Sequence, residues 1–207
     1  MRKIRQMMMA DPISRVMRAL ERARLDTSDY DLNPDIVLPA GRKLRPAGVL
    51  VAIGEAEFGP AVYLTKRSSA LKHHPGQIAF PGGKQDAGDP DVTAAALREA
   101  WEEIGLESEN VEVLGALPSH ETVTSFIVTP VVARVRKPFL LKAEPGEVEE
   151  VFTVPLDHLL KLENFNVESR RWRGHQRSYY TVPFGPYYIW GATARILRAL
   201  ADAARTA

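Results

Sequence analysis

Three glutamates within two turns of a predicted helix constrain this chain more than any other feature. Glu99, Glu102 and Glu103 stand at positions i, i+3 and i+4 of an alanine-rich run, so they are neighbours on one helix face. Like charges at this spacing weaken a helix, and in a partly buried site their repulsion would approach about 3 kcal/mol per pair. A cation is therefore expected against this face, and clustered carboxylate oxygens suit Mg²⁺ or Mn²⁺.

The residues around the glutamates predict where the helix begins and ends. Asp89 is expected to be the N-cap, with Pro90 at the first helical position and Asp91 in the first turn. Gly105 is suited to end the helix in the left-handed conformation. An apolar stripe, expected to lie opposite the glutamates and to pack on a sheet, consists of Leu97, Trp101 and Ile104.

The segment that begins at Gly82-Gly83 and ends at Leu106 resembles the Nudix box. The family pattern is Gly, five residues, Glu, seven residues, then Arg-Glu-apolar-x-Glu-Glu-x-Gly-apolar. Its second half is matched by Arg98, Glu99, Ala100, Glu102, Glu103, Gly105 and Leu106. Its first half differs, because Asp89 stands where Glu is usual and one extra residue precedes Arg98. The glutamates alone favour a solvated acidic face with an Arg98–Glu102 pair, but the Gly-Gly turn and this order of residue types favour the metal site.

The resemblance implies roles for individual residues. Glu99 and Glu103 are the implied metal ligands, Glu102 a third ligand, and the carbonyl of Gly82 a backbone ligand, for Mg²⁺ or Mn²⁺. Arg98 and Glu102 are counted as catalytic residues because they belong to the same motif.

A second motif directly precedes the box. The segment from Leu64 to Gly83 is similar to the signature of the coenzyme A pyrophosphatase branch of the family, which has Leu-Thr-x-Arg-Ser, a basic residue, a glycine and Phe-Pro-Gly-Gly. The substrate-binding residues that it implies are Arg67, Ser68, Lys72 and Gly76. Lys72 replaces the usual Arg and so keeps the charge without the bidentate fork. For any one of these residues, a solvated strand end is an equally good interpretation. Further resemblance extends the match to roughly residues 45–200.

The implied reaction is metal-dependent hydrolysis of coenzyme A or its derivatives to 3′,5′-ADP and (acyl-)4′-phosphopantetheine. It needs a general base within reach of the attacking water. Glu147, after Pro145-Gly146, is the candidate, and Glu121 is the alternative. Two rival functions stay open: a Nudix hydrolase of another nucleoside diphosphate derivative, such as ADP-ribose or a dinucleotide, and a non-catalytic nucleotide-binding module.

Composition excludes several classes of function. The chain carries 27 basic and 26 acidic residues, a net charge of +1, which gives no drive toward nucleic acid or membrane surfaces. It has no cysteine, which rules out disulfides, zinc–thiolate sites and thiol nucleophiles. No apolar run approaches the length of a membrane span. We expect a small-molecule substrate and a cytoplasmic location; the basic first nine residues leave organellar import open, and a homodimer is also left open.

The patterning predicts two regions, an N-terminal helix and linker at 1–44 and a Nudix hydrolase domain at 45–207. The first helix, expected at 12–25, should pack on the domain or on a second subunit rather than on a membrane. Strands are expected at 48–53, 61–65, 111–116, 126–136 and, around a turn, at 170–181, with a turn beginning at Gly54-Glu55. Further helices are expected after Pro155 and at 187–206. The fold class is α/β, and the resemblance implies a Nudix-like α/β/α sandwich with a mixed central sheet.

Overall fold

The computed structural model describes residues 11–38, 41–172 and 174–205. Within these ranges a nine-stranded sheet has the core order β1-β7-β8-β2-β3-β4, while β5 pairs with β2, β6 with β8 and β9 with β3. Its strands are β1 (Thr27–Ser28), β2 (Arg45–Ala56), β3 (Gly59–Arg67), β4 (Ile78–Ala79), β5 (Gly82–Lys84), β6 (Val111–Ala116), β7 (His120–Glu121), β8 (Phe126–Val135) and β9 (Val148–Pro155). The sheet is mixed, because β2 runs parallel to β8 but antiparallel to β3.

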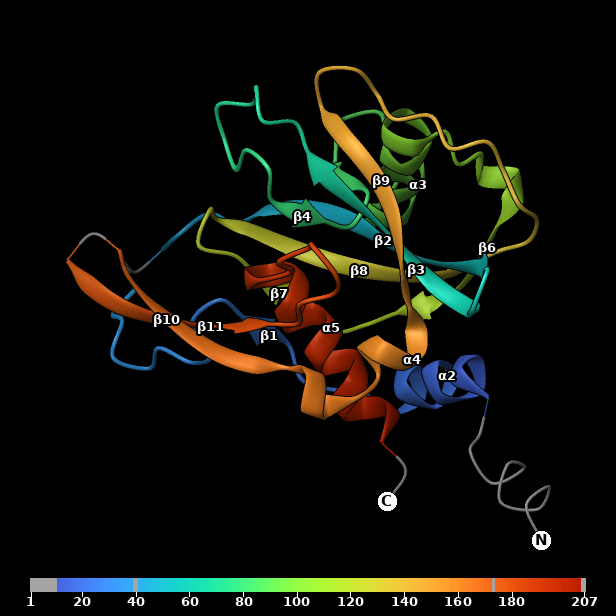
Figure 1. Ribbon diagram of the computed structural model, residues 1–207. Helices are drawn as coiled ribbons and strands as arrows, with labels where there is room; N and C mark the ends of the chain where they lie inside the picture. Colours follow the sequence, from blue (N-terminus) through green and yellow to red (C-terminus); the bar gives the residue numbers. More distant parts are fainter. Residues whose placement is uncertain (1–10, 39–40, 173, 206–207) are drawn as a thin grey trace, which may run out of the picture.

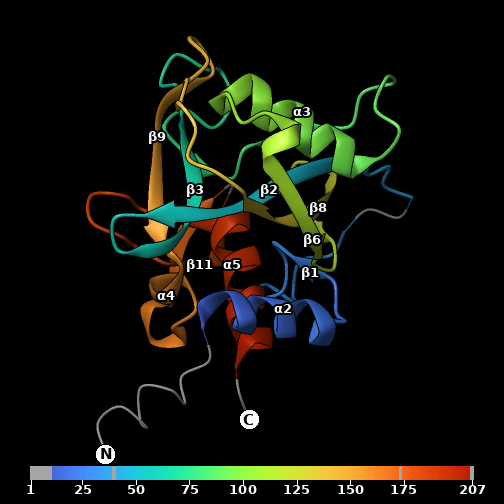
Figure 2. The same cartoon turned by 90° about the vertical axis from the view of Figure 1, so that its right-hand side faces the viewer.

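Helices cover both faces of this sheet. Helix α3 (Val92–Ile104) lies on one face, and α2 (Pro12–Arg22) and α5 (Gly191–Ala204) lie on the other (Figures 1 and 2). Alternate residues of β2 supply the two cores: Leu50 packs in the cluster that includes α3, and Val51 in the cluster that includes α2 and α5. The predicted α/β/α sandwich with a mixed sheet is confirmed.

Close packing explains why one predicted turn is wrong. The turn expected at Gly54-Glu55 begins three residues later, because β2 continues to Ala56 and Gly54 pairs with Ala61. A Cβ at Gly54 would lie 2.8 Å from the ring of Tyr63. The glycine therefore makes room for an aromatic ring within the strand pair and does not mark the turn.

Helix α3 differs from the prediction at its start and on its buried face. Its N-cap is Asp91, whose side chain accepts a hydrogen bond from Ala94 N at 2.8 Å, and not Asp89. Trp101 is 57% exposed, so its place in the buried stripe was wrong. The residues that face the sheet are Ala95, Ala96, Ala100, Glu103 and Ile104. This buried face consists mostly of small side chains because α3 packs very close to β2. A Cβ at Gly48 of β2 would overlap the carbonyl oxygen of Val92, at the start of the helix. The predicted left-handed end at Gly105 is confirmed, with φ 74°.

The C-terminal third adds a hairpin and a closing helix. The region expected to form strands around a turn at 170–181 is an antiparallel hairpin, a separate two-stranded sheet of β10 (Asn166–Trp172) and β11 (His175–Thr181), and its first strand begins before the predicted start. The short helices are α4 (Leu156–Leu159), as expected after Pro155, and the 3-10 turns η1 (Ser108–Asn110) and η2 (Leu162–Asn164). Helix α5 begins at Gly191, not at Tyr187, and the predicted end at Thr206 lies outside the described residues.

The N-terminal segment packs on the rest of the chain. Val16 and Ala19 of α2 are fully buried in the core shared with α5. Farther along, the side-chain amide of Asn33 donates to Ser178 O at 2.9 Å and its oxygen accepts from Ser178 N at 2.8 Å, which ties the segment to β11. Of the helices in the described ranges, none is both long and apolar enough to cross a bilayer.

Candidate active site

The glycines of β5 stand directly against the glutamates of α3. Gly82 N donates a hydrogen bond to Glu103 Oε2 at 3.1 Å. A side chain at Gly83 would overlap the carboxylate of Glu99, and a Cβ at Gly82, whose φ is +152°, would press on the backbone of Gly48. Both positions therefore require glycine, because only bare backbone lets two carboxylates lie this close to the sheet.

Burial raises the pKa of both carboxyl groups. Glu103 is 5% exposed, and burial is the main cause that raises its pKa to about 8; the Gly82 hydrogen bond opposes this, and the charge of Glu99 adds to it. Burial also raises the pKa of Glu99, against the lowering effect of Arg98. A divalent cation would favour the ionised form of both groups, and carboxylate oxygens suit such a cation. The donor set therefore fits a hard metal ion.

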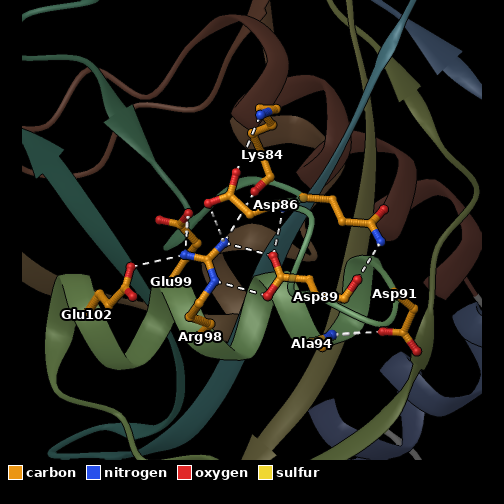
Figure 3. A network of polar contacts seen from close by, with 9 residues as sticks. Lys84, Asp86, Asp89, Asp91, Ala94, Arg98, Glu99 and Glu102 are labelled. Carbon is orange, nitrogen blue, oxygen red and sulfur yellow. Dashed lines mark hydrogen bonds and ion pairs between the residues drawn. The ribbon is translucent and has the colours of Figure 1, made fainter.

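Arg98 joins four acidic side chains and one carbonyl (Figure 3). Its Nε and Nη2 each donate to the carboxylate of Asp89 at 3.0 Å, and its Nη1 donates to Glu99 at 2.9 Å and Glu102 at 3.0 Å. Nη2 also lies near Asp86 and Lys84 O. These hydrogen bonds, that to Asp89 foremost, raise the pKa of Arg98, and Arg98 in turn lowers the pKa of Asp89. Asp89 is thus the anchor of Arg98, which is the correction to its predicted role as N-cap.

The described residues contain no group of three acidic, histidine or cysteine side chains that already converge on one point as a metal site would. The contacts of Arg98 give the physical reason, because its Nη1 holds Glu99 and Glu102. Glu102 is about half exposed and turned toward Arg98. The predicted ligands that the structure brings together are accordingly Glu99 and Glu103, beside the backbone of Gly82.

The loop between β3 and β4 carries the predicted substrate-binding residues. Its ends are joined by Arg67 N to Gln77 O at 2.9 Å and Gly76 N to Arg67 O at 3.1 Å, with Gly76 in the left-handed region at φ 69°. The charge of Arg67 acts on Glu103, and Arg67 Nε is buried without a hydrogen-bond partner among the described residues. Lys72 lies in the exposed part of the loop and forms no ion pair with any described side chain.

A third segment brings Glu147 to the same place. The loop before β9 is fixed on the end of α3 by Lys142 N to Ile104 O and Glu144 N to Glu103 O, both at 3.1 Å. Ser68 N then donates to Glu147 O at 2.8 Å, which joins this loop to the β3–β4 loop. The charge of Glu147 raises the pKa of both Glu99 and Glu103. The candidate base therefore lies within electrostatic reach of the two glutamates.

The alternative base occupies a different environment. Glu121 lies in β7 and forms an ion pair with Arg42. Its neighbour His120 is fully buried between Thr27 Oγ1 at 2.9 Å and Asp29 Oδ1 at 3.2 Å, which fastens β1 to β7. Sequence reasoning missed one supporting contact, Lys66 Nζ to Glu149 at 2.6 Å, because it joins positions 83 residues apart.

Comparison with known proteins agrees with this architecture. Residues 43–173 match the family profile described as the NUDIX domain. The chain is 42% identical over 183 residues to the "Uncharacterized Nudix hydrolase NudL" of Enterobacter sp. (strain 638), covering 83% of this chain and 95% of the relative. It is 40% identical over 185 residues to the protein of the same name from Klebsiella pneumoniae (strain 342), covering 84% and 96%.

Solved structures with a similar fold include the C. elegans Ap4A hydrolase binary complex, with TM-score 0.45, 20% identity and coverage of 54% of this chain and 80% of that one. Another is the NUDIX domain of Shewanella oneidensis NrtR in complex with ADP ribose, with TM-score 0.45, 17% identity and coverage of 64% and 84%. The sandwich, the box helix and the sequence matches define a Nudix-type pyrophosphohydrolase, the enzyme class expected from the sequence. The chain belongs to the Nudix family.

Proposed function

We propose that this protein hydrolyses the pyrophosphate bond of coenzyme A or its derivatives, giving 3′,5′-ADP and (acyl-)4′-phosphopantetheine. One observation carries the proposal: Arg67-Ser68, from the coenzyme A-type motif, lies beside the glutamates of the Nudix box. The charge of Arg67 acts on Glu103, and Ser68 N is bonded to the backbone of Glu147. An anionic substrate held by the motif is thereby presented to the acidic site.

Glu99 and Glu103, with Glu102 and the Gly82 carbonyl, would hold Mg²⁺ or Mn²⁺. Such an ion, when bound, lowers the pKa of water and neutralises charge on the pyrophosphate. The burial of Glu103 and the partial burial of Glu99, which raise the pKa of both carboxyl groups, support this role. Asp89 anchors Arg98 through two hydrogen bonds of its own, so the guanidinium is held beside Glu99 and Glu102 whichever partner those carboxylates take.

The remaining roles belong to the two loops. Arg67, with its buried and unpartnered Nε, supplies charge-assisted hydrogen bonds to phosphate oxygens. Ser68 and Gly76 shape the turn around the substrate, and Lys72 adds a mobile point charge at its exposed end. Glu147 accepts the proton of the attacking water, and its place next to Ser68 keeps that carboxylate near the phosphates.

A product assay tests the proposal. Coenzyme A, acyl-coenzyme A, ADP-ribose, NADH and nucleoside triphosphates are each incubated with the enzyme and Mg²⁺ or Mn²⁺, and the products are identified by mass. We expect the highest kcat/KM on a coenzyme A compound, with 3′,5′-ADP released. Faster turnover of ADP-ribose or NADH would replace the substrate assignment within the family, and no turnover of any compound would favour a binding module.

A further inference from the structure

Four residues that the proposed reaction does not use form one cluster between the β10–β11 hairpin and the segment before α5. The guanidinium carbon of Arg170 lies 4.3 Å from the ring centre of Trp190 and 5.8 Å from that of Tyr179. The rings of Tyr179 and Trp190 meet edge to face with centroids 5.3 Å apart. The hydroxyl of Tyr188 lies 3.4 Å from that of Tyr179. We call Arg170, Tyr179, Tyr188 and Trp190 the aromatic cluster.

Packing alone does not explain the aromatic cluster. Tyr188 is 48% exposed, and Arg170 is exposed and makes no ion pair with any side chain in the described ranges. In the strand register Arg170 stands opposite Arg177, and like charges in directly opposed positions are unfavourable. Half-exposed aromatic rings with a cation over them are instead a common arrangement for recognising flat, polar rings.

The aromatic cluster is connected to the site through Gln77. A Cβ at Gly191, the residue after Trp190, would lie 3.8 Å from Gln77 Nε2, and Thr193 Oγ1 donates to Ile78 O at 3.1 Å. Gln77 is itself hydrogen-bonded to Arg67 across the loop. Trp190 and Arg67 are therefore linked through only two intervening residues, Gly191 and Gln77. The hairpin and the β3–β4 loop also project on the same side of the molecule (Figure 1).

We infer that the aromatic cluster binds the purine base of the nucleotide half of the substrate. The inference rests on the proposed function, since it takes the diphosphate to lie at Arg67. A base stacked on Tyr188 and Trp190 would then be joined to that diphosphate by a single ribose. Arg170 lies over the rings of Trp190 and Tyr179, and its charge favours an anionic nucleotide. Every base offers a flat face, so the cluster contributes affinity for a nucleotide and not for the pantetheine arm.

The test measures binding of each product half by titration calorimetry. The variants are Tyr188→Ala and Arg170→Gln, with Tyr188→Phe and Phe58→Ala as controls; Phe58 is an exposed aromatic in the turn between β2 and β3. We expect the two test variants to raise the Kd for 3′,5′-ADP roughly tenfold, to leave the Kd for 4′-phosphopantetheine unchanged and to keep the wild-type Tm. Tyr188→Phe keeps the ring and should bind like wild type, as should Phe58→Ala.

Unchanged binding of 3′,5′-ADP by Tyr188→Ala and Arg170→Gln overturns the inference, as does weakening confined to 4′-phosphopantetheine. Failure of the proposed function looks different, because wild-type protein would then not hydrolyse coenzyme A. In that case the same variants are titrated with 5′-AMP. Roughly tenfold weaker binding of 5′-AMP would still support a base-binding site at the aromatic cluster, whereas unchanged binding would refute it.

Discussion

Glu103 carries its carboxyl group where burial opposes charge. Its pKa is raised from 4.5 to about 8, with burial as the main cause. Between these two pH values the metal-free native state binds a proton that the unfolded state has lost. The contribution of Glu103 to the free energy of unfolding is therefore fully present below about pH 4.5 and decreases as pH rises toward the folded pKa.

Glu103→Gln should consequently stabilise the metal-free protein at high pH. The variant can keep the hydrogen bond from Gly82 N and has no charge to bury. The gain in unfolding free energy should be near zero below about pH 4.5 and should grow by up to about 1.4 kcal/mol per pH unit toward pH 8. Urea unfolding in EDTA measures it, with the exposed Glu107→Gln as control. Parallel curves of unfolding free energy against pH for wild type and Glu103→Gln would contradict a buried carboxyl group with a raised pKa.

The charge of Arg67 acts on the buried Glu103, so we assign Arg67 to the pyrophosphate. Arg67→Ala should then raise KM for coenzyme A and for 3′-dephospho-coenzyme A by the same factor, roughly tenfold to a hundredfold. Arg67→Lys, which keeps the charge, should lose less. Steady-state kinetics on both substrates decides the matter, and a loss confined to coenzyme A would move Arg67 to the 3′-phosphate.

At the scale of elements, local patterns predicted what local forces determine. The alanine-rich run and Gly105 predicted α3, and alternation predicted β6 with the bounds that the structure has. Strand β9 was not predicted, because Glu149 and Glu150 interrupt its apolar pattern. In the fold Lys66 and the hydroxyl of Tyr187 bind those two acids, and neither contact is visible in a local window.

The candidate site also has features that the sequence could predict and features that only the fold determines. The spacing of Glu99, Glu102 and Glu103 and the coenzyme A-type motif are local, so the sequence could indicate them. The rotation of α3 that exposes Trp101 and buries Glu103 depends on contact with Gly48, which is far from the helix in sequence. The pairing of Asp89 with Arg98 likewise depends on the folded loop, which is why a capping role was assigned to Asp89.

Glu147, in the loop before β9, is the proposed general base. Glu147→Gln should lower kcat about 10²- to 10⁴-fold with little change in KM, because it removes a general base. Glu144→Gln should be near neutral, since the contact of Glu144 with α3 uses its backbone N. The rates on the best substrate are compared. A large loss in Glu121→Gln with none in Glu147→Gln would assign the base to β7.

The segment at 23–38 contacts the β10–β11 hairpin through Asn33, and we expect this contact to stabilise the fold. Asn33 is 8% exposed, and its side chain makes three hydrogen bonds, two to Ser178 and one to Asp29 O. Asn33→Ala should lower the unfolding free energy by about 2–3 kcal/mol, because Ser178 loses both partners in a part-buried place. Asn110→Ala removes a similar but exposed clamp on Lys137 and should cost less. Equally small losses of unfolding free energy in both variants would show that the contact of Asn33 with the hairpin contributes little to stability.

At the scale of the whole molecule, the candidate site lies on the α3 face of the sheet and the larger hydrophobic core lies on the opposite face. The acidic site is assembled from β5 with α3, the β3–β4 loop and the loop before β9. Helices α2 and α5 fill the larger core on the opposite face (Figure 2). Substitutions in the site should therefore alter turnover without unfolding the protein.

Glu103 tests the central claim most directly, since it is both a buried residue of α3 and a proposed metal ligand. The most direct measurement is kcat of Glu103→Gln on coenzyme A at saturating Mg²⁺ and Mn²⁺, beside Glu107→Gln. We predict that Glu103→Gln loses turnover by at least about three orders of magnitude while its Tm stays at or above that of wild type, and that Glu107→Gln remains fully active. Near-wild-type turnover in folded Glu103→Gln would contradict a hydrolytic centre built on these glutamates.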